Sequence, residues 1–461
     1  MKKIIRGGTV VTASDTYQAD VLIDQEKVIA IGESLDAEGA EIIDAAHCYL
    51  FPGGIDPHTH LSMPFGGTMT SDDFTTGTIA AAFGGTTSIL DFCLSSKGQT
   101  LQEAIGIWHE KSRGKAVIDY GFHLMIAEAN DAILEELGSV VEHEGITSLK
   151  VFMAYKNVLQ ADDETLFKTL IRAKEIGALV QVHAENGDVI DYLTQKAIAA
   201  GHTEPIYHAL TRPPEAEGEA TGRAIALTAL ADAQLYVVHV SCAQAVQRIA
   251  EAREKGWNIY GETCPQYLVL DIHELERPDF AGAKYVWSPP LREAWHQETL
   301  WSALGSGILQ TIGSDHCPFN FVGQKELGRD DFRKIPNGGP IIEDRFGILF
   351  SEGVHAGRIS LNQFVDVTST KAAKLFGLFP KKGTIAIGSD ADIVIFDPKA
   401  TRVVSANTHH MNVDYNPFEG IKLQGDVVSV LSRGNFVIRE RQYVGSTGAG
   451  QYLHRKRFAK P

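Results

Sequence analysis

The chain has 461 residues, with 42 lysines and arginines against 58 aspartates and glutamates, which gives a formal net charge of −16. Hydrophobic residues make up 44% and charged residues 22%, a globular composition and not a disordered one. The acidic balance argues against a nucleic-acid-binding protein, and no apolar run approaches the ~18 residues of a membrane span.

The chain is longer than one hydrophobic core of about 250–300 residues can serve, so we expect one large domain and a smaller unit. The start of the chain carries lysines and glycines but no apolar segment, so we do not expect a signal peptide there. Five cysteines are scattered and form no C-x-x-C pair, which indicates reduced thiols in a cytoplasmic protein. The 17 histidines raise the question of whether some are placed for chemistry.

Short strands dominate both ends of the chain. Alternating or apolar runs broken by Gly, Asp and charged residues predict strands at 3–5, 8–11, 20–23 and 27–31, and again at 383–388, 392–397, 427–431 and 435–438. Two such ends around a different middle indicate one small β-sandwich built from both termini. We expect its parts to be residues 1–51 and 379–445, and residues 446–461 to form an exposed, Gly-rich and then basic tail.

The middle of the chain, residues 52–378, alternates strands and helices. Buried strands are predicted at 48–56, 86–93, 116–125, 148–153, 179–184, 234–241, 258–263 and 309–314. Clear helices lie at 162–177, with acidic residues at its start and a glycine at its end, and at 243–255. Eight such repeats predict an α/β fold, a (β/α)8 TIM-like barrel. A doubly wound sheet is the rival, but the chain has no G-x-G-x-x-G turn.

Unusual polar residues follow several of these strands. His58 and His60 end the first strand, where residues two apart point the same way. Lys150 lies inside the fourth strand, and three more polar residues lie at or near the ends of the fifth, sixth and eighth strands: His183, His239 and Asp315. This is the rim where barrels of this kind place their active sites.

Each of these residues alone has an ordinary structural explanation. A histidine at a strand end is more often a hydrogen-bonded core residue, a lysine can extend its ammonium to solvent, and an aspartate after a strand often caps a turn. Together, however, these residues are all expected at one rim of the barrel. Independent structural roles would not place them all there. Imidazole and carboxylate suit Zn²⁺ and, less selectively, Mn²⁺ or Co²⁺. A desolvated lysine is a nucleophilic amine that can add CO2, and its carbamate can bridge two metals.

Six stretches of the chain carry a family resemblance. They are FPGGIDPHTH at 51–60, SLKVFMAY at 148–155, VHAENG at 182–187, GETCPQYL at 261–268, SPPLR at 288–292 and PNGGP at 336–340. With them, nearly the whole chain resembles the cyclic-amidase branch of the amidohydrolase superfamily, and within it the bacterial D-hydantoinases and dihydropyrimidinases.

The resemblance implies a role for each of these residues. His58, His60 and Asp315 hold one metal, His183 and His239 hold the other, and carboxylated Lys150 bridges them. Tyr155 donates its hydroxyl to the developing oxyanion, Ser288 and Asn337 bind the ring amide and carbonyl groups, and Asp315 moves the proton of a bridging hydroxide. The expected reaction is hydrolysis of the cyclic amide of 5-substituted hydantoins and dihydropyrimidines to N-carbamoyl amino acids. A homotetramer, with the tail at a subunit interface, is also implied.

The substituent on the substrate ring is expected to meet an uncharged wall. Dihydroorotases of this fold carry Arg after the histidine pair, whereas here Leu61 follows His60. Loops of the resembled family that form this wall correspond to Leu61, Met63, Phe65, Cys93, Leu94, Phe152 and Leu159. Ordinary loop packing explains any one of them equally well. No role is assigned to His316 or Cys317.

Two alternatives stay open at this point. An allantoinase or dihydroorotase of the same superfamily would share the metal ligands and differ in substrate. A non-enzymatic assembly homologue would have lost ligands, whereas every ligand type is present here.

Overall fold

The computed structural model describes residues 2–36 and 38–460. Eight parallel strands follow one another in chain order in one sheet. They are β6 (Gly54–Thr59), β9 (Thr86–Cys93), β10 (Asp119–Met125), β11 (Ser148–Phe152), β12 (Leu179–His183), β13 (Leu235–Val237), β14 (Ile259–Thr263) and β15 (Thr311–Ile312). A parallel bridge between Thr59 and His316 brings the first and last strands together. The barrel is therefore nearly closed, and the predicted (β/α)8 fold class is confirmed.

The eight predicted barrel strands all have counterparts in the structure. The first differs most, because the predicted run 48–56 is divided between β5 (Tyr49–Pro52) of another sheet and β6 of the barrel. Gly53 lies at the division, where an added Cβ would come 2.0 Å from the side chain of Thr87. Only glycine lets the chain pass from one sheet to the other so close to its neighbour. Residues of the barrel strands are buried on both faces, as a parallel sheet covered by helices requires.

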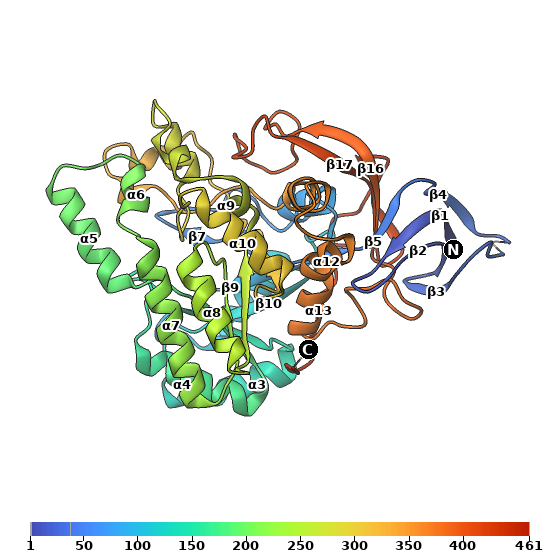
Figure 1. Cartoon of the computed structure of the whole chain (residues 1–461). Coiled ribbons are helices and arrows are strands. Elements are labelled where there is room, and N and C mark those ends of the chain that lie inside the picture. Colours follow the sequence, from blue (N-terminus) through green and yellow to red (C-terminus); the bar gives the residue numbers. More distant parts are fainter. Residues whose placement is uncertain (1, 37, 461) are drawn as a thin grey trace.

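Helices surround the barrel (Figure 1). They are α1 (Thr76–Phe83), α2 (Leu101–Ser112), α3 (Asp131–Ser139), α4 (Asp163–Ile176), α5 (Gly187–Ala199), α6 (Ile206–Leu210), α7 (Pro214–Ala231), α8 (Ala243–Glu254), α9 (Pro265–Val269), α10 (Trp295–Gly305), α11 (Arg345–Ile348), α12 (Leu361–Val365) and α13 (Lys371–Leu375). The two helices predicted from their end signals are α4 and α8. Within residues 2–36 and 38–460, no helix combines the length and apolar character needed to cross a membrane.

The start of α4 offers a test of its predicted cap. The carboxylate of Asp162 accepts a hydrogen bond of 2.8 Å from the backbone N–H of Thr165, and this bond is the main reason that the pKa of Asp162 is lowered. Asp162→Ala is expected to reduce the free energy of unfolding by about 1 kcal/mol at pH 7. Because the folded-state pKa is the lower one, this contribution is present above the unfolded pKa and disappears as pH falls through the folded value. Urea unfolding at pH 7 and pH 2.5 measures both, and a difference that persists undiminished at pH 2.5 would contradict the capping role.

Both ends of the chain meet in one nine-stranded mixed sheet, which lies beside the barrel (Figure 1). Its order is β19-β18-β17-β16-β5-β1-β2-β3, with β4 paired to β1. The strands are β1 (Lys3–Val11), β2 (Thr16–Asp24), β3 (Lys27–Gly32), β4 (Glu41–Asp44), β5, β16 (Ile393–Val403), β17 (Lys422–Ser432), β18 (Asn435–Arg439) and β19 (Gln442–Tyr443). A small β-structure from both termini is thus confirmed, whereas the boundaries 1–51, 52–378, 379–445 and 446–461 stay a prediction. A short hairpin, β7 (Pro64–Phe65) and β8 (Thr68–Met69), follows the first barrel strand.

The expectation of an exposed tail is right for most of residues 446–460 and wrong for the few that pack on the barrel. Tyr452 pairs with Tyr120 of β10, and Leu453 and Arg455 are buried. Arg455 donates a hydrogen bond of 2.9 Å to the hydroxyl of Ser148, the first residue of β11. The tail therefore covers the N-terminal ends of the barrel strands of its own chain. Apolar residues between its charged ones, such as Leu453, are buried in a hydrophobic cluster there. A place for the tail at a subunit interface stays a prediction.

Candidate metal centre and active site

Four imidazole rings form a continuous row at the C-terminal end of the barrel. His58 lies in β6, His60 directly after it, His183 ends β12, and His239 lies two residues beyond β13. Successive ring centroids along the row His60–His58–His239–His183 are 5.2, 5.3 and 4.6 Å apart. The barrel topology alone brings these histidines together, since the ends of parallel strands meet at one rim.

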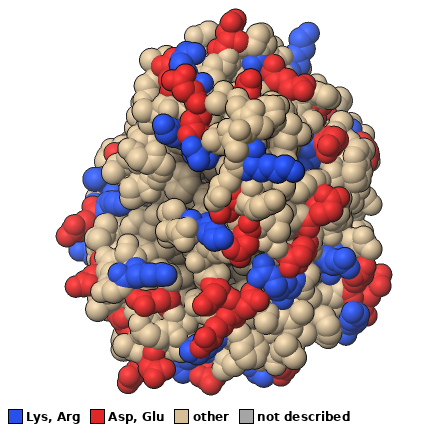
Figure 2. Space-filling view, turned by 90° about the vertical axis from the view of Figure 1, so that its left-hand side faces the viewer, with Lys and Arg blue, Asp and Glu red and all other residues tan. Residues whose placement is uncertain are grey.

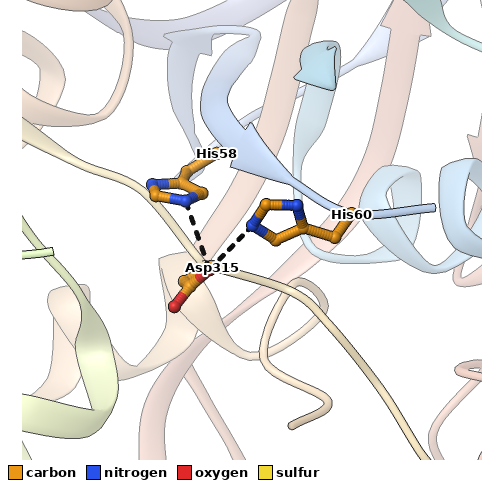
Figure 3. Close-up of side chains that lie close together, drawn as sticks. All are labelled: His58, His60 and Asp315. Carbon is orange, nitrogen blue, oxygen red and sulfur yellow. Dashed lines mark ion pairs between the residues drawn. The ribbon is translucent and has the colours of Figure 1, made fainter. Parts of the chain in front are cut away.

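Asp315 joins the first two histidines (Figure 3). Its Oδ1 lies 3.2 Å from Nε2 of His58 and 3.1 Å from Nε2 of His60, so that one ligand atom from each residue faces a common point. The backbone of Asp315 has a φ of +54°, and that of His239 a φ of +40°. Such left-handed conformations cost free energy in residues other than glycine and concentrate at functional sites.

Two buried glutamates orient the histidines from behind. Glu262 lies 2.7 Å from Nδ1 of His58, and Glu185 lies 2.8 Å from Nε2 of His183. If each carboxylate accepts the ring N–H, the other ring nitrogen carries a lone pair. Nε2 of His58 then presents its lone pair to Asp315, and Nδ1 of His183 presents its lone pair to Nε2 of His239, 3.0 Å away. Among the described residues, Nε2 of His58 has no hydrogen-bond partner. A divalent metal would bind both this lone pair of His58 and the facing carboxylate oxygen of Asp315, so the residues present fit such an ion.

The protonation of the histidines agrees with this fit. Burial is the main cause that holds the pKa of His58 and of His239 well below the usual range. Both rings are therefore neutral at pH 7, which is the form that binds a metal ion.

Glu262 and Glu185 were not predicted as site residues, although each stands in a quoted motif. Glu262→Gln is expected to weaken metal binding about 10–100-fold, because the amide no longer fixes the proton on Nδ1 of His58. Competition with a coloured chelator measures the affinity. The matched control is Glu343→Gln, which changes a buried glutamate paired with the exposed His410 (2.9 Å) outside the cavity described below. An equal loss in both variants would show that Glu262 acts only on general stability.

Lys150 lies among the metal-site side chains in an apolar setting. Its side chain is 1% exposed, and its Nζ lies 5.0 Å from the ring centroids of both Phe92 and Phe152. The ring of Phe92 also contacts His58 and His60. Burial lowers the pKa of Lys150 to about 7, against the opposing charges of Asp315 and Glu262. A large fraction of the amine is therefore unprotonated, and nucleophilic, at neutral pH.

Tyr155 and the pair Ser288 and Asn337 lie beside this group. The ring of Tyr155 is 5.3 Å from that of His183, and its backbone has a φ of +67°. Burial raises the pKa of Tyr155 to about 12, in spite of hydrogen bonding to Ser288 and Asn337, so its hydroxyl is protonated and can donate. The side-chain amide of Asn337 donates to the hydroxyl of Ser288 at 3.0 Å.

A cavity of about 690 Å³ opens above these residues. Its lining includes all nine predicted metal, catalytic and substrate-binding residues: His58, His60, Lys150, Tyr155, His183, His239, Ser288, Asp315 and Asn337. Five of the seven predicted wall residues line it as well: Met63, Phe65, Leu94, Phe152 and Leu159. The sequence reasoning did not single out His208 and Arg212, which also face this space.

The other two predicted wall residues do not reach the cavity. Leu61 and Cys93 are fully buried in the main hydrophobic core. Leu61 packs over Gly77 of α1, and Cys93 follows Phe92 in β9, so its side chain points to the opposite face of the strand. Of the two unassigned residues, His316 is buried against Asp72 at 3.0 Å, whereas Cys317 lines the cavity.

Comparison with known proteins settles the family. Residues 49–437 match the model of the amidohydrolase family. The chain belongs to this family. The D-hydantoinase of Geobacillus stearothermophilus is 71% identical over 99% of this chain and 97% of its own length. The crystal structure of dihydropyrimidinase from Brevibacillus agri NCHU1002 is 78% identical, covers both chains fully and superposes with a TM-score of 1.00.

A more distant amidohydrolase shows what the shared fold leaves open. The L-hydantoinase (dihydropyrimidinase) of Arthrobacter aurescens is 30% identical, covers 99% of this chain and 100% of its own, and superposes with a TM-score of 0.89. Relatives with this fold thus include both D- and L-hydantoinases. The fold positions the reacting groups, and the cavity wall is left to distinguish the substrates.

Proposed function

We propose that this chain hydrolyses the cyclic amide bond of 5-substituted hydantoins and dihydropyrimidines and releases N-carbamoyl amino acids. The observation that carries the proposal is the row of four histidines with Asp315 and Lys150 at the floor of a largely apolar cavity. The high identity to D-hydantoinase over the whole chain supports it. A preference for D-configured rings is part of the proposal and rests on those relatives.

We further propose that the site holds two divalent metals, with Zn²⁺ the best match for its imidazole and carboxylate ligands and Mn²⁺ or Co²⁺ as alternatives. His58, His60 and Asp315 would hold one ion, and His183 and His239 the other. Lys150, as its carbamate, would contribute to both. When bound, such metals supply hydroxide at neutral pH and polarise the scissile carbonyl.

Other steps of the reaction are carried out by side chains of the protein. Ser288 and Asn337 bind the amide and carbonyl groups of the ring and orient the scissile bond. The protonated hydroxyl of Tyr155 donates to the carbonyl oxygen as it gains negative charge. The carboxylate of Asp315 accepts the proton of the attacking hydroxide and returns it to the ring nitrogen as the C–N bond breaks.

A hydrolysis panel with and without a chelator tests the proposal. 5-Phenylhydantoin, dihydrouracil, allantoin and dihydroorotate are each incubated with the purified protein, and ring opening is followed by absorbance or chromatography. We expect the first two to be hydrolysed, the last two to be poor substrates, and chelation to abolish turnover until Zn²⁺ or Mn²⁺ is added. Preferred turnover of allantoin or dihydroorotate would replace the proposed substrates. No turnover together with no bound metal would instead favour an assembly protein.

The remaining proposals concern the setting of the enzyme. We propose a homotetramer that works in the cytoplasm on small molecules and not on nucleic acid. On the face shown in Figure 2, acidic and basic side chains are interspersed, which does not suit a nucleic-acid backbone. Light scattering after size exclusion tests the tetramer, and a monomer mass near 50.2 kDa would contradict it.

A further inference from the structure

A second buried lysine lies next to the cavity, outside the metal site. Lys325 begins a 3-10 turn (Lys325–Gly328) in the long loop between β15 and α11, and its side chain is 0% exposed. Its ammonium donates three hydrogen bonds, all to backbone carbonyls: Val286 at 3.1 Å, Pro336 at 2.6 Å and Gly338 at 2.7 Å. Within residues 2–36 and 38–460, no carboxylate forms an ion pair with it.

These three carbonyls belong to the two segments that carry Ser288 and Asn337. Val286 precedes Ser288 by two residues, and Pro336 and Gly338 flank Asn337 on either side. The segments touch at two further points, where the backbone N–H of Gly338 donates to Val286 at 3.0 Å and the amide of Asn337 donates to Ser288 at 3.0 Å. Lys325 is thus the centre of the junction between the two segments, and Gly338 itself lines the cavity.

The hydrogen-bonding capacity of lysine matches this junction, whereas an apolar side chain could only fill the space. A protonated lysine amine has three donors and no acceptor, and here each donor meets one carbonyl. Burial lowers the pKa of Lys325 to about 7, and the three carbonyl oxygens favour the protonated form against this effect. Burying a charge without a carboxylate opposes folding, and an apolar side chain of similar length would avoid that cost. What an apolar side chain cannot do is hold three carbonyls of two separate segments at one point.

We propose that Lys325 is a positioning residue of the active site, which fixes the relative placement of Ser288 and Asn337 against the ring of the substrate. The proposal rests on the function proposed above. It predicts that loss of the ammonium affects the binding of substrate, while the metal site, built from other strands, stays intact.

Lys325→Met tests this, since methionine fills similar space without donors. We expect KM for 5-phenylhydantoin to rise about tenfold, as for the loss of one well-placed hydrogen bond. We expect kcat to change less than about threefold and bound metal to equal that of the wild type. Lys382→Met is the matched control, because Lys382 is also a buried lysine but bonds Asp119, Asp390 and Asp392 away from the cavity. It should lower thermal stability and leave KM unchanged.

The outcomes separate this inference from the proposed function. Wild-type protein that hydrolyses hydantoins while Lys325→Met keeps the wild-type KM would overturn the inference alone. A wild-type protein that binds metal but hydrolyses none of the substrates would contradict both the proposed function and this inference. A fall in kcat with loss of metal would place Lys325 in the support of the metal site and contradict its positioning role. Should Lys325→Met not fold, Lys325→Gln and Lys325→Arg carry the same measurement, and failure of all three to fold would make Lys325 a folding residue only.

Discussion

Replacing Lys150 by alanine is expected to reduce kcat/KM by about 10³-fold or more. Lys150 is the only predicted ligand that would contact both metals, so its loss removes the group that holds them together. The electrostatic contribution of such metals is several kcal/mol, and about 4 kcal/mol corresponds to a factor of about 10³. Metal analysis of the purified variant should show less bound ion per chain than the wild type, with the loss of metal and the loss of rate in parallel.

A chemical rescue makes the prediction specific for the carbamate. Removing the side chain leaves a space beside Phe92 and Phe152, and a small carboxylate such as acetate or propionate can enter it. Millimolar carboxylate with added Zn²⁺ should restore part of the activity of Lys150→Ala, whereas chloride at equal ionic strength should not. Full activity of Lys150→Ala with two bound metals would show that no bridging group is needed.

Tyr155→Phe is expected to lower kcat about 10²–10³-fold, the effect of removing one oxyanion donor worth ≈2.7–4 kcal/mol. Because burial raises the pKa of Tyr155 to about 12, the hydroxyl stays protonated over the working pH range, and the loss should be the same at pH 7 and pH 9. Metal content should not change, since the phenol is not a proposed ligand. Steady-state kinetics and metal analysis of one preparation measure both quantities.

The control for this variant is Tyr192→Phe, a tyrosine that is 68% exposed on α5 and should tolerate the change. A Tyr155→Phe enzyme with wild-type kcat but raised KM would mean that the hydroxyl binds the ground state of the substrate and not the oxyanion.

The parts of the site that sequence could predict share one property. His58, His183, His239 and Lys150 are polar residues in or directly after runs of apolar ones, and in a parallel barrel such positions converge whatever the details of packing. Strand periodicity and the location of the rim are local and topological rules, so they can be applied without coordinates.

The parts that could not be predicted depend on direction or on contacts between distant segments. Leu61 and Cys93 are expected on the cavity wall because of their loops. One step along β9 turns the side chain of Cys93 to the opposite face, and Leu61, which lies in the turn after β6, packs over Gly77. Glu262 meets His58 across 204 positions of sequence, and neither residue alone shows the pairing. The basic composition of the tail predicts exposure, which holds for most of its described residues but not for Leu453 and Arg455.

The position of β5 has a consequence for synthesis on the ribosome. This strand lies between β1 and β16, yet the 340 residues of positions 53–392 separate it from β16. At about 5–20 residues per second, roughly 20–70 s pass before its second neighbour is made. During that time the nascent chain presents an unpaired strand edge, which is a site for association with other chains. The first strands translated are therefore the ones with most need of protection while the barrel is still being made.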